Sequence, residues 1–503
     1  MCPQVEAQTQ CMLNDGTDDL KLETQTMTRL VLGFFVVLAA LSQPAVAQKE
    51  ALSTSVERRE AETWDLATKI WELAEPGYQE VESSRLLADA LERAGFVVKR
   101  GVAEIPTAFT ATYGEGSPVI AILGEYDALP GLSQDAVPER LPRGKSGYGH
   151  ACGHHLFGAA SLSAAIAVAE QIKAKQIKGT VRFYGCPAEE GGSGKAFMVR
   201  AGLFSDCDVA LHWHPAPRNT AGDSTCLARA AVKFRFHGTS AHAAGSPELG
   251  RSALDAIELT CHASELLREH TPDFTRIHHV ITSGGGAPNV VPDFSEVFFY
   301  IRHPKAEVVR ELYPRLLKCA QAGALATDTK LEELYLGGTM ELLPNDRLAA
   351  LALENLRQLN HLKYDAKQLE FAQRISQTLP KPASLDTVGQ TTDTSGEINK
   401  GSTDVGDVSW VLPTAGFTTA CFVPGTPAHS WQAVAAGGTS IGKQGMQLAA
   451  KTLAATAWDL YRSPETIAAA KTEFTNRLSG RKYEPLLLPG QKAPLDYRNA
   501  PGP

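Results

Sequence analysis

The feature that most constrains the fold of this chain is a set of short apolar runs that are followed by glutamate or histidine, residue types that can bind metals. The runs at 119–123, 181–185 and 208–212 have the length and apolar content of short strands. The second run is followed by Glu189 and Glu190, and the third ends at His212. In open α/β sheets, ligands bind at the carboxyl ends of the strands. We therefore predict an α/β fold with a ligand site at that edge of the sheet.

Cys152 and His154 lie where a loop is predicted to become a helix. They follow the glycine-rich segment 143–149 and precede the Ala-rich stretch 156–172, which has the composition of a buried helix. With the residues at the strand ends they supply thiolate, imidazole and carboxylate donors, as a two-metal hydrolytic site requires. A thiolate at Cys152 could bridge two cations, because it carries a full charge and several lone pairs. The predicted metal ligands are Cys152, His154, Glu190, His212 and His429.

The adjacent glutamates at 189 and 190 suit a division of labour. Neighbouring residues at a strand end point in different directions, so only one of them easily faces a given metal. We assign Glu190 as a metal ligand and Glu189 as the general base. A carboxylate held beside a metal-activated water can collect its proton during attack on an amide carbonyl.

Each of these elements also has an ordinary explanation. A lone Glu-Glu pair is usually a solvated surface, and a lone Cys-x-His is more often core or chance than a ligand. Five donors, most of them beside apolar runs or glycine and proline, make coincidence a poor explanation.

Seven ordered motifs between about residues 61 and 460 resemble the M20 metallopeptidases. The most similar branch is the amidohydrolases that include the aminobenzoyl-glutamate hydrolases and the aminoacylases, and the segments 401–410 and 429–432 resemble the former group in particular. The motifs are Gly124-Glu-Tyr-Asp-Ala-Leu-Pro130, His150-Ala-Cys-Gly-His154, Pro187-Ala-Glu-Glu-Gly191, Leu211-His212, Gly238-Thr-Ser-Ala-His-Ala243, Asn289-Val-Val-Pro292 and His429-Ser430.

The resemblance implies a two-metal, aminopeptidase-like α/β catalytic domain that is interrupted by an α+β lid and dimerisation domain. It carries the ligand roles onto the five donors above and the general base onto Glu189. Asp127 matches an aspartate that orients a site histidine, and His242 matches a lid histidine that polarises the scissile carbonyl, in many members from the partner subunit. Asn289 and Arg302 match lid residues that grip the substrate carboxylate. The expected boundaries are 48–229 and 341–470 for the catalytic domain, 230–340 for the lid and 471–503 for a C-terminal tail.

The expected reaction is hydrolysis of an N-acyl or N-aroyl amino acid, with aminobenzoyl-glutamate as the leading specific substrate. A dipeptidase or aminoacylase of wider scope is the alternative enzyme, and a metal-binding relative without turnover is the alternative from another class. The expected cofactors are two divalent ions, zinc or manganese, because thiolate and imidazole suit zinc whereas carboxylates also accept manganese. The expected partners are a small-molecule substrate and a second copy of the chain in a homodimer.

Composition and the first residues bear on location and partners. The 503 residues carry a formal net charge of −8, which argues against a general nucleic-acid binder, and they contain no Gly-x-x-x-x-Gly-Lys-Ser/Thr phosphate-binding loop. The segment after Met27 has the order of a signal peptide. The charged Arg29 is followed by the apolar run 30–41 and then by Pro44-Ala-Val-Ala47, which has the form of a cleavage site. We therefore expect a cleaved leader at 1–47, no stable membrane anchor, and a periplasmic or secreted enzyme.

Overall fold

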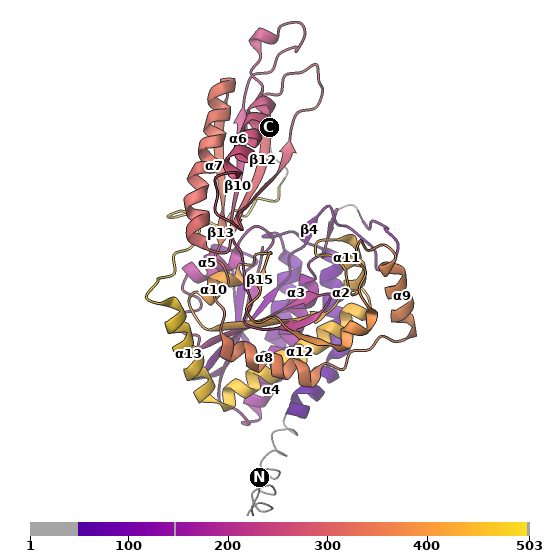
Figure 1. The fold of residues 1–503 in the computed structure, drawn as a ribbon. Helices are drawn as coiled ribbons and strands as arrows, with labels where there is room; N and C mark the ends of the chain where they lie inside the picture. The colour runs from indigo at the N-terminus through magenta and orange to yellow at the C-terminus, as the bar shows by residue number, and fades with distance from the viewer. Residues whose placement is uncertain (1–48, 145–146, 500–503) are drawn as a thin grey trace, which may run out of the picture. The chain divides into compact units, whose positions relative to one another are not determined.

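The computed structural model describes residues 49–144 and 147–499 (Figure 1). The leader predicted at 1–47 lies outside the described residues. From Leu52 onward, the described residues belong to one compact unit.

A mixed eight-stranded sheet forms the centre of the domain that we expect to be catalytic, called the catalytic domain below. Its central strands β6, β3, β7 and β16 run parallel, so their carboxyl ends meet at one edge. β1, β2, β8 and β14 extend the sheet on both sides of these four. In sheet order the strands are β1 (Val97–Arg100), β2 (Phe109–Glu115), β6 (Gly179–Cys186), β3 (Val119–Glu125), β7 (Val209–Ala216), β16 (Thr414–Ala420), β8 (Asn219–Ala221) and β14 (Thr391–Asp393).

Helix α4 is buried against this sheet and packs beside α12. Its sequence is apolar almost all round, as a helix enclosed by other elements must be. It is long and apolar enough to cross a membrane, yet 78% of its most apolar window is buried inside the protein, as in a core helix. The helices of the catalytic domain are α2 (Glu60–Leu73), α3 (Val81–Arg93), α4 (His154–Lys173), α5 (Gly194–Arg200), α8 (Asp346–Leu359), α9 (Ala366–Ser376), α10 (Val405–Ser409), α11 (Trp431–Gly437), α12 (Ser440–Arg462) and α13 (Pro464–Leu478).

An antiparallel four-stranded sheet forms the inserted lid domain, with two helices packed on it (Figure 1). Alternating side chains of β10 bury Phe234 and Phe236 between the sheet and α7, where Leu312 and Leu316 meet them. The prediction of an α/β fold with an inserted α+β domain is thus confirmed. In sheet order the strands are β11 (Arg276–Ser283), β12 (Phe294–His303), β10 (Ala228–His237) and β13 (Lys330–Thr339), and the helices are α6 (Ala253–Arg268) and α7 (Ala306–Thr327).

The segment that follows α13 is packed against both domains, although we expected only a tail there. The Tyr483 hydroxyl donates to Asp407 Oδ1 in the catalytic domain at 2.8 Å. Leu486 is buried in the lid core, and its carbonyl accepts a hydrogen bond from Tyr335 of β13 at 3.0 Å. We call residues 479–499 the C-terminal strap.

Candidate metal centre

Five side chains converge at the carboxyl edge of the central strands. Cys152 Sγ, a ring nitrogen of His154 and a ring nitrogen of His214 lie within 4.8 Å of one another. Cys152 Sγ forms a second such group with Glu190 and His429. The thiol is shared by the two groups, which is the geometry that bridging of two cations requires.

The local backbone presents Cys152 and His154 from the start of α4. Gly153 lies between them in the left-handed region, with a φ of 79°. A Cβ atom at this position would also lie 2.7 Å from Cβ of Pro215, at the end of β7. Only glycine therefore allows the loop to approach β7 so closely.

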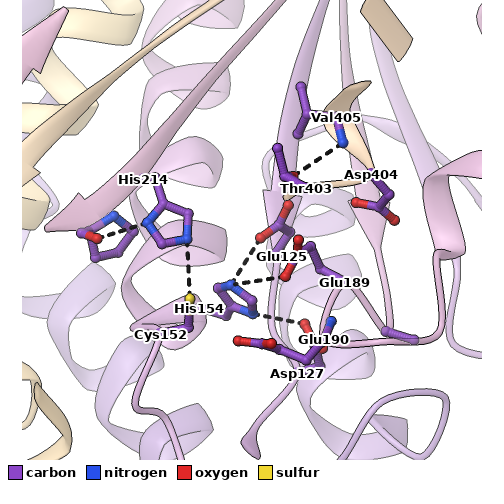
Figure 2. Close-up of polar contacts among 12 residues, drawn as sticks. Glu125, Asp127, Cys152, His154, Glu189, Glu190, His214, Thr403, Asp404 and Val405 are labelled. Carbon is purple, nitrogen blue, oxygen red and sulfur yellow. Dashed lines mark hydrogen bonds and ion pairs between the residues drawn. The ribbon is translucent and has the colours of Figure 1, made fainter. Parts of the chain in front are cut away.

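Asp127 fixes the orientation of the His154 ring. Its Oδ1 lies 2.8 Å from His154 Nδ1, and its Oδ2 accepts a hydrogen bond from the backbone N–H of Glu190 at 2.9 Å (Figure 2). Because Nδ1 is held by a carboxylate, Nε2 is the ring atom left to bind a metal. The position matches the orienting role that the resemblance implies for Asp127.

The structure brings His214 to the cluster instead of His212. His214 Nε2 lies 3.3 Å from Cys152 Sγ (Figure 2), whereas His212 belongs to none of the donor groups in the described part of the chain. The ring of His212 packs on β16, where a Cβ atom at Gly416 would approach it to 2.2 Å. Burial there lowers the pKa of His212 to about 3. The two histidines share one face of β7, but His214 lies one pleat closer to the carboxyl edge.

Burial and mutual charge set the protonation of the donors. Burial opposes ionisation of Cys152, but the neighbouring His214 and His154 together outweigh it and lower the pKa of the thiol well below its usual value. Burial likewise opposes ionisation of Glu190, and His429, whose Nε2 lies 3.0 Å from Oε1, nevertheless holds the pKa of Glu190 below its usual value. The charge of Glu190 in turn raises the pKa of His429 to about 11.

Glu189 contributes a carboxylate next to His154, the member of the donor cluster that it approaches. Its Oε2 lies 4.0 Å from His154 Nε2, and with Glu125 and His154 it forms a third group of closely spaced donors. Burial and, secondly, the charge of Glu190 raise the pKa of Glu189 well above its usual value. Glu189 and Glu190 thus face different members of the cluster, as their assignment to different roles requires.

A buried ion network behind the donors was missed by sequence reasoning. Lys195 of α5 is fully buried, and its Nζ lies 2.6 Å from Glu125 Oε1 and 2.6 Å from Asp404 Oδ1. The other oxygen of Glu125 lies 3.1 Å from His154 Nε2 (Figure 2). Glu125 and Asp404 both lie in segments that resemble the M20 family, and this resemblance could have drawn attention to them. Lys195 lies in no such segment.

Comparison with known proteins decides the family. Residues 121–433 match the description peptidase family M20/M25/M40. The chain belongs to this family. It is 43% identical over 427 residues to one of the subunits of p-aminobenzoyl-glutamate hydrolase of Escherichia coli (strain K12), across 79% of this chain and 88% of that protein. It is 30% identical over 440 residues to Xaa-Arg dipeptidase of Homo sapiens, across 83% of this chain and 90% of that protein.

A solved structure supports the same fold. A Bacillus subtilis protein described as a dinuclear metal binding peptidase from M20 family superposes with a TM-score of 0.51 and 19% sequence identity, covering 81% of this chain and 99% of that one. The M20 resemblance seen in the motifs is confirmed, and the chain is a hydrolase of the peptidase and amidohydrolase type.

Of the three lid residues to which the M20 resemblance assigns a role, one lines the cavity at the donor cluster and two do not. Arg302 of β12 lines a cavity of about 830 Å³ that also contains Cys152, Glu189 and His429. His242 and Asn289 are exposed on the lid and do not line this cavity. The structure therefore brings Arg302, but not His242 or Asn289, to the site of the same chain.

Paired histidine variants of this M20 protein distinguish the two possible ligands on β7. We expect His214→Asn to lose about one metal ion per chain, because a three-donor group then keeps only two donors. The matched change His212→Asn is expected to leave the metal content unchanged. Inductively coupled plasma mass spectrometry of both purified variants measures this. Metal loss in His212→Asn alone would restore the assignment made from the sequence.

Proposed function

We propose that this chain hydrolyses the amide bond of N-acyl or N-aroyl amino acids with the help of two divalent metal ions. The observation that carries the proposal is the position of Glu189, a buried carboxylate that faces the clustered donors from the wall of the same cavity. Its role as general base, and not the fold alone, distinguishes an amidohydrolase from a metal-binding relative without turnover.

The donor set fits two divalent ions. Nε2 of His154 and Oε1 of Glu190 are buried, and their close polar neighbours are other imidazole and carboxylate groups of the site, Glu125 at 3.1 Å and His429 at 3.0 Å. Buried donors of these types that lie this close together suit shared metal ions. Thiolate and imidazole donors suit zinc, and carboxylate donors also suit manganese, so we propose one of these two metals. The proposed ligands are Cys152, His154 and His214 on one side, and Cys152, Glu190 and His429 on the other.

Bound divalent ions would supply Lewis acidity to the water and to the amide carbonyl. Glu189 would take a proton from the attacking water and pass it to the leaving amine nitrogen. Asp127 would keep the His154 ring in place through its Nδ1 atom. Arg302, whose guanidinium reaches the same cavity, would hold a substrate carboxylate.

We propose p-aminobenzoyl-glutamate as the first substrate to test, because the E. coli relative named for its hydrolysis is 43% identical across most of both chains. The similarity to Xaa-Arg dipeptidase supports dipeptides as the alternative substrate class. The cavity volume of about 830 Å³ is within the range of small-molecule sites.

A substrate panel with and without metal tests the proposal. The purified chain is assayed on p-aminobenzoyl-glutamate, N-acetyl amino acids and dipeptides, before and after dialysis against a chelator. We expect turnover to be lost on chelation and restored by zinc or manganese, with about two metals bound per active chain. Turnover that persists after complete metal removal would contradict the mechanism, and metal binding without any turnover would favour the non-catalytic alternative.

We also propose that the chain forms a homodimer through its lid. β11 is an edge strand of the lid sheet whose Val280 and Ile281 are 56% and 42% exposed, and edge strands readily pair with another chain. A second chain could present its exposed His242 or Asn289 to this site. The E. coli relative is named as one subunit of a hydrolase that has a second, different one, so a hetero-oligomer is the alternative. Light scattering on the chain alone, and again with the candidate partner, distinguishes the two.

We propose that the enzyme is exported. The support is the order of charged, apolar and Ala-x-Ala segments within residues 1–47. Amino-terminal sequencing of the protein recovered from a periplasmic fraction tests this, and a start at Gln48 is expected.

A further inference from the structure

Glu80 is a fully buried carboxylic acid outside both the donor groups and the cavity wall of the described chain. It directly precedes α3, but its side chain does not cap that helix. Instead, Oε1 accepts a hydrogen bond from the backbone N–H of Ala188 at 2.8 Å, and Oε2 accepts one from the hydroxyl of Thr107 at 2.9 Å. Burial of an acidic side chain is costly, so these contacts need a reason beyond the packing of α3.

The contact with Ala188 reaches the loop that carries the two site glutamates. Ala188 directly precedes Glu189, and its backbone lies in the left-handed region with a φ of 56°. Ser193, at the other end of the same turn, has a φ of 60°. A residue with a Cβ atom holds this conformation only where surrounding contacts impose it. Residues 187–193, which we call the catalytic loop, are therefore held in shape from outside.

Side chains from distant segments also hold the rest of the catalytic loop. The Tyr78 hydroxyl donates to the carbonyl oxygen of Gly192 at 2.6 Å. On the C-terminal strap, the Tyr497 hydroxyl donates to the carbonyl oxygen of Glu190 at 2.9 Å, and Arg498 donates to the same oxygen. These contacts hold the second half of the loop, whereas the buried carboxylic acid before α3 holds its first half.

We infer that Glu80 is a positioning residue: by accepting the N–H of Ala188, it holds the catalytic loop in the shape that presents Glu189 and Glu190 to the donor cluster. Glu80 acts through the backbone and does not touch the substrate. The part that concerns Glu189 rests on the proposed function, in which this residue is the general base. The part that concerns Glu190 is a statement about metal binding and stands apart from turnover.

Two variants of Glu80 separate its hydrogen bond from its presence in the core. Glu80→Ala is expected to lower kcat by roughly 10- to 100-fold with KM nearly unchanged, because a small displacement of a catalytic group slows the chemical step. Glu80→Gln is expected to restore most of kcat, because its amide oxygen can accept the same N–H. Burial and, secondly, the charge of Asp127 raise the pKa of Glu80 to about 8, so a neutral side chain can fill this role at neutral pH.

Glu341→Ala is the matched control. Glu341 is another buried acidic residue outside the cavity wall, and its Oε2 accepts the backbone N–H of Ala306 at the start of α7 at 2.9 Å. Its loss is expected to lower the melting temperature, as Glu80→Ala does, but to leave kcat unchanged. Equal kcat values for Glu80→Ala and Glu341→Ala would overturn the inference. Failure of Glu80→Gln to restore kcat would do the same.

Zinc titration against a chromophoric chelator provides a readout that does not depend on turnover. In Glu80→Ala, the zinc ion that Glu190 and His429 share is expected to bind roughly 10- to 100-fold more weakly, the usual effect of removing a group that orients a ligand. The ion held by Cys152, His154 and His214 is expected to keep its affinity. Equal weakening of both ions, or of neither, would overturn the inference.

The same titration distinguishes failure of the inference from failure of the proposed function. If the wild-type chain hydrolyses no compound of the substrate panel, the proposed function fails and the zinc affinities alone decide the inference. Selective weakening of one zinc ion in Glu80→Ala, restored in Glu80→Gln and absent in Glu341→Ala, supports it. Zinc affinities that are the same in Glu80→Ala and Glu341→Ala overturn it.

Discussion

Glu189→Gln is expected to lower kcat by about 10²- to 10⁴-fold, the usual contribution of a positioned general base. Glutamine keeps the size and shape of the side chain but cannot accept the proton of the attacking water. Glu189 lies in the wall of the cavity, 4.0 Å from the His154 nitrogen that is left for a metal, and its neighbour Glu190 is the residue that contacts His429. The loss should therefore fall on the chemical step and leave substrate binding nearly unchanged.

Steady-state kinetics combined with metal analysis separates the two glutamates. Glu189→Gln should retain the metal content of the wild type, whereas Glu190→Gln should lose metal because an amide oxygen is a weaker ligand than a carboxylate. An unchanged kcat in Glu189→Gln with a full metal content would refute its assignment as the general base.

Lys195→Met is expected to destabilise the fold by about 3–5 kcal/mol, the cost of breaking a buried ion pair by removing one partner. The Lys195 side chain is fully buried between Glu125 and Asp404, with 2.6 Å from Nζ to each carboxylate. Asp404 also accepts a hydrogen bond from the backbone N–H of Lys195 at 2.8 Å. Without the lysine, two carboxylates would remain buried with no cation between them.

Urea unfolding of the metal-loaded and the chelated protein measures this effect. Lys69→Met is the matched control, because Lys69 pairs with Asp65 at 2.7 Å on the exposed surface of α2, where a pair contributes about 0–1 kcal/mol. A difference between wild type and Lys195→Met that is no larger than that of the control would show that this network contributes little to stability.

Local sequence patterns were sufficient to predict those site residues that are neighbours in the sequence. Cys152 and His154 are separated only by a glycine at the start of a helix, and Glu189 and Glu190 directly follow a strand, so short segments predict both their positions and their division into roles. The choice between His212 and His214 could not be made in the same way. Both side chains point to the same face of β7, and which of them reaches Cys152 depends on how far that strand extends beyond its neighbours.

Residues that act through distant contacts left no local pattern to detect. Lys195 and Asp404 are 209 positions apart in the sequence, and a lysine in the short segment after a loop gives no sign that it is buried. Arg498 lies in a segment rich in proline and polar residues, for which sequence favours a tail. Its place beside Glu190 follows from the packing of the strap against the lid and the catalytic loop, which only the folded chain specifies.

The strap also has a practical consequence for samples of this protein. Exposed turns without regular secondary structure, such as the one at Ser479 and Gly480 that joins α13 to the strap, are preferred sites of protease nicking. A nick there would cut the covalent link between α13 and the segment that carries Tyr497 and Arg498, so that only packing and hydrogen bonds would hold this segment in place. A preparation that is partly clipped would then look folded by spectroscopy yet show two populations in substrate titrations. Intact-mass measurement should therefore precede any comparison of KM between batches.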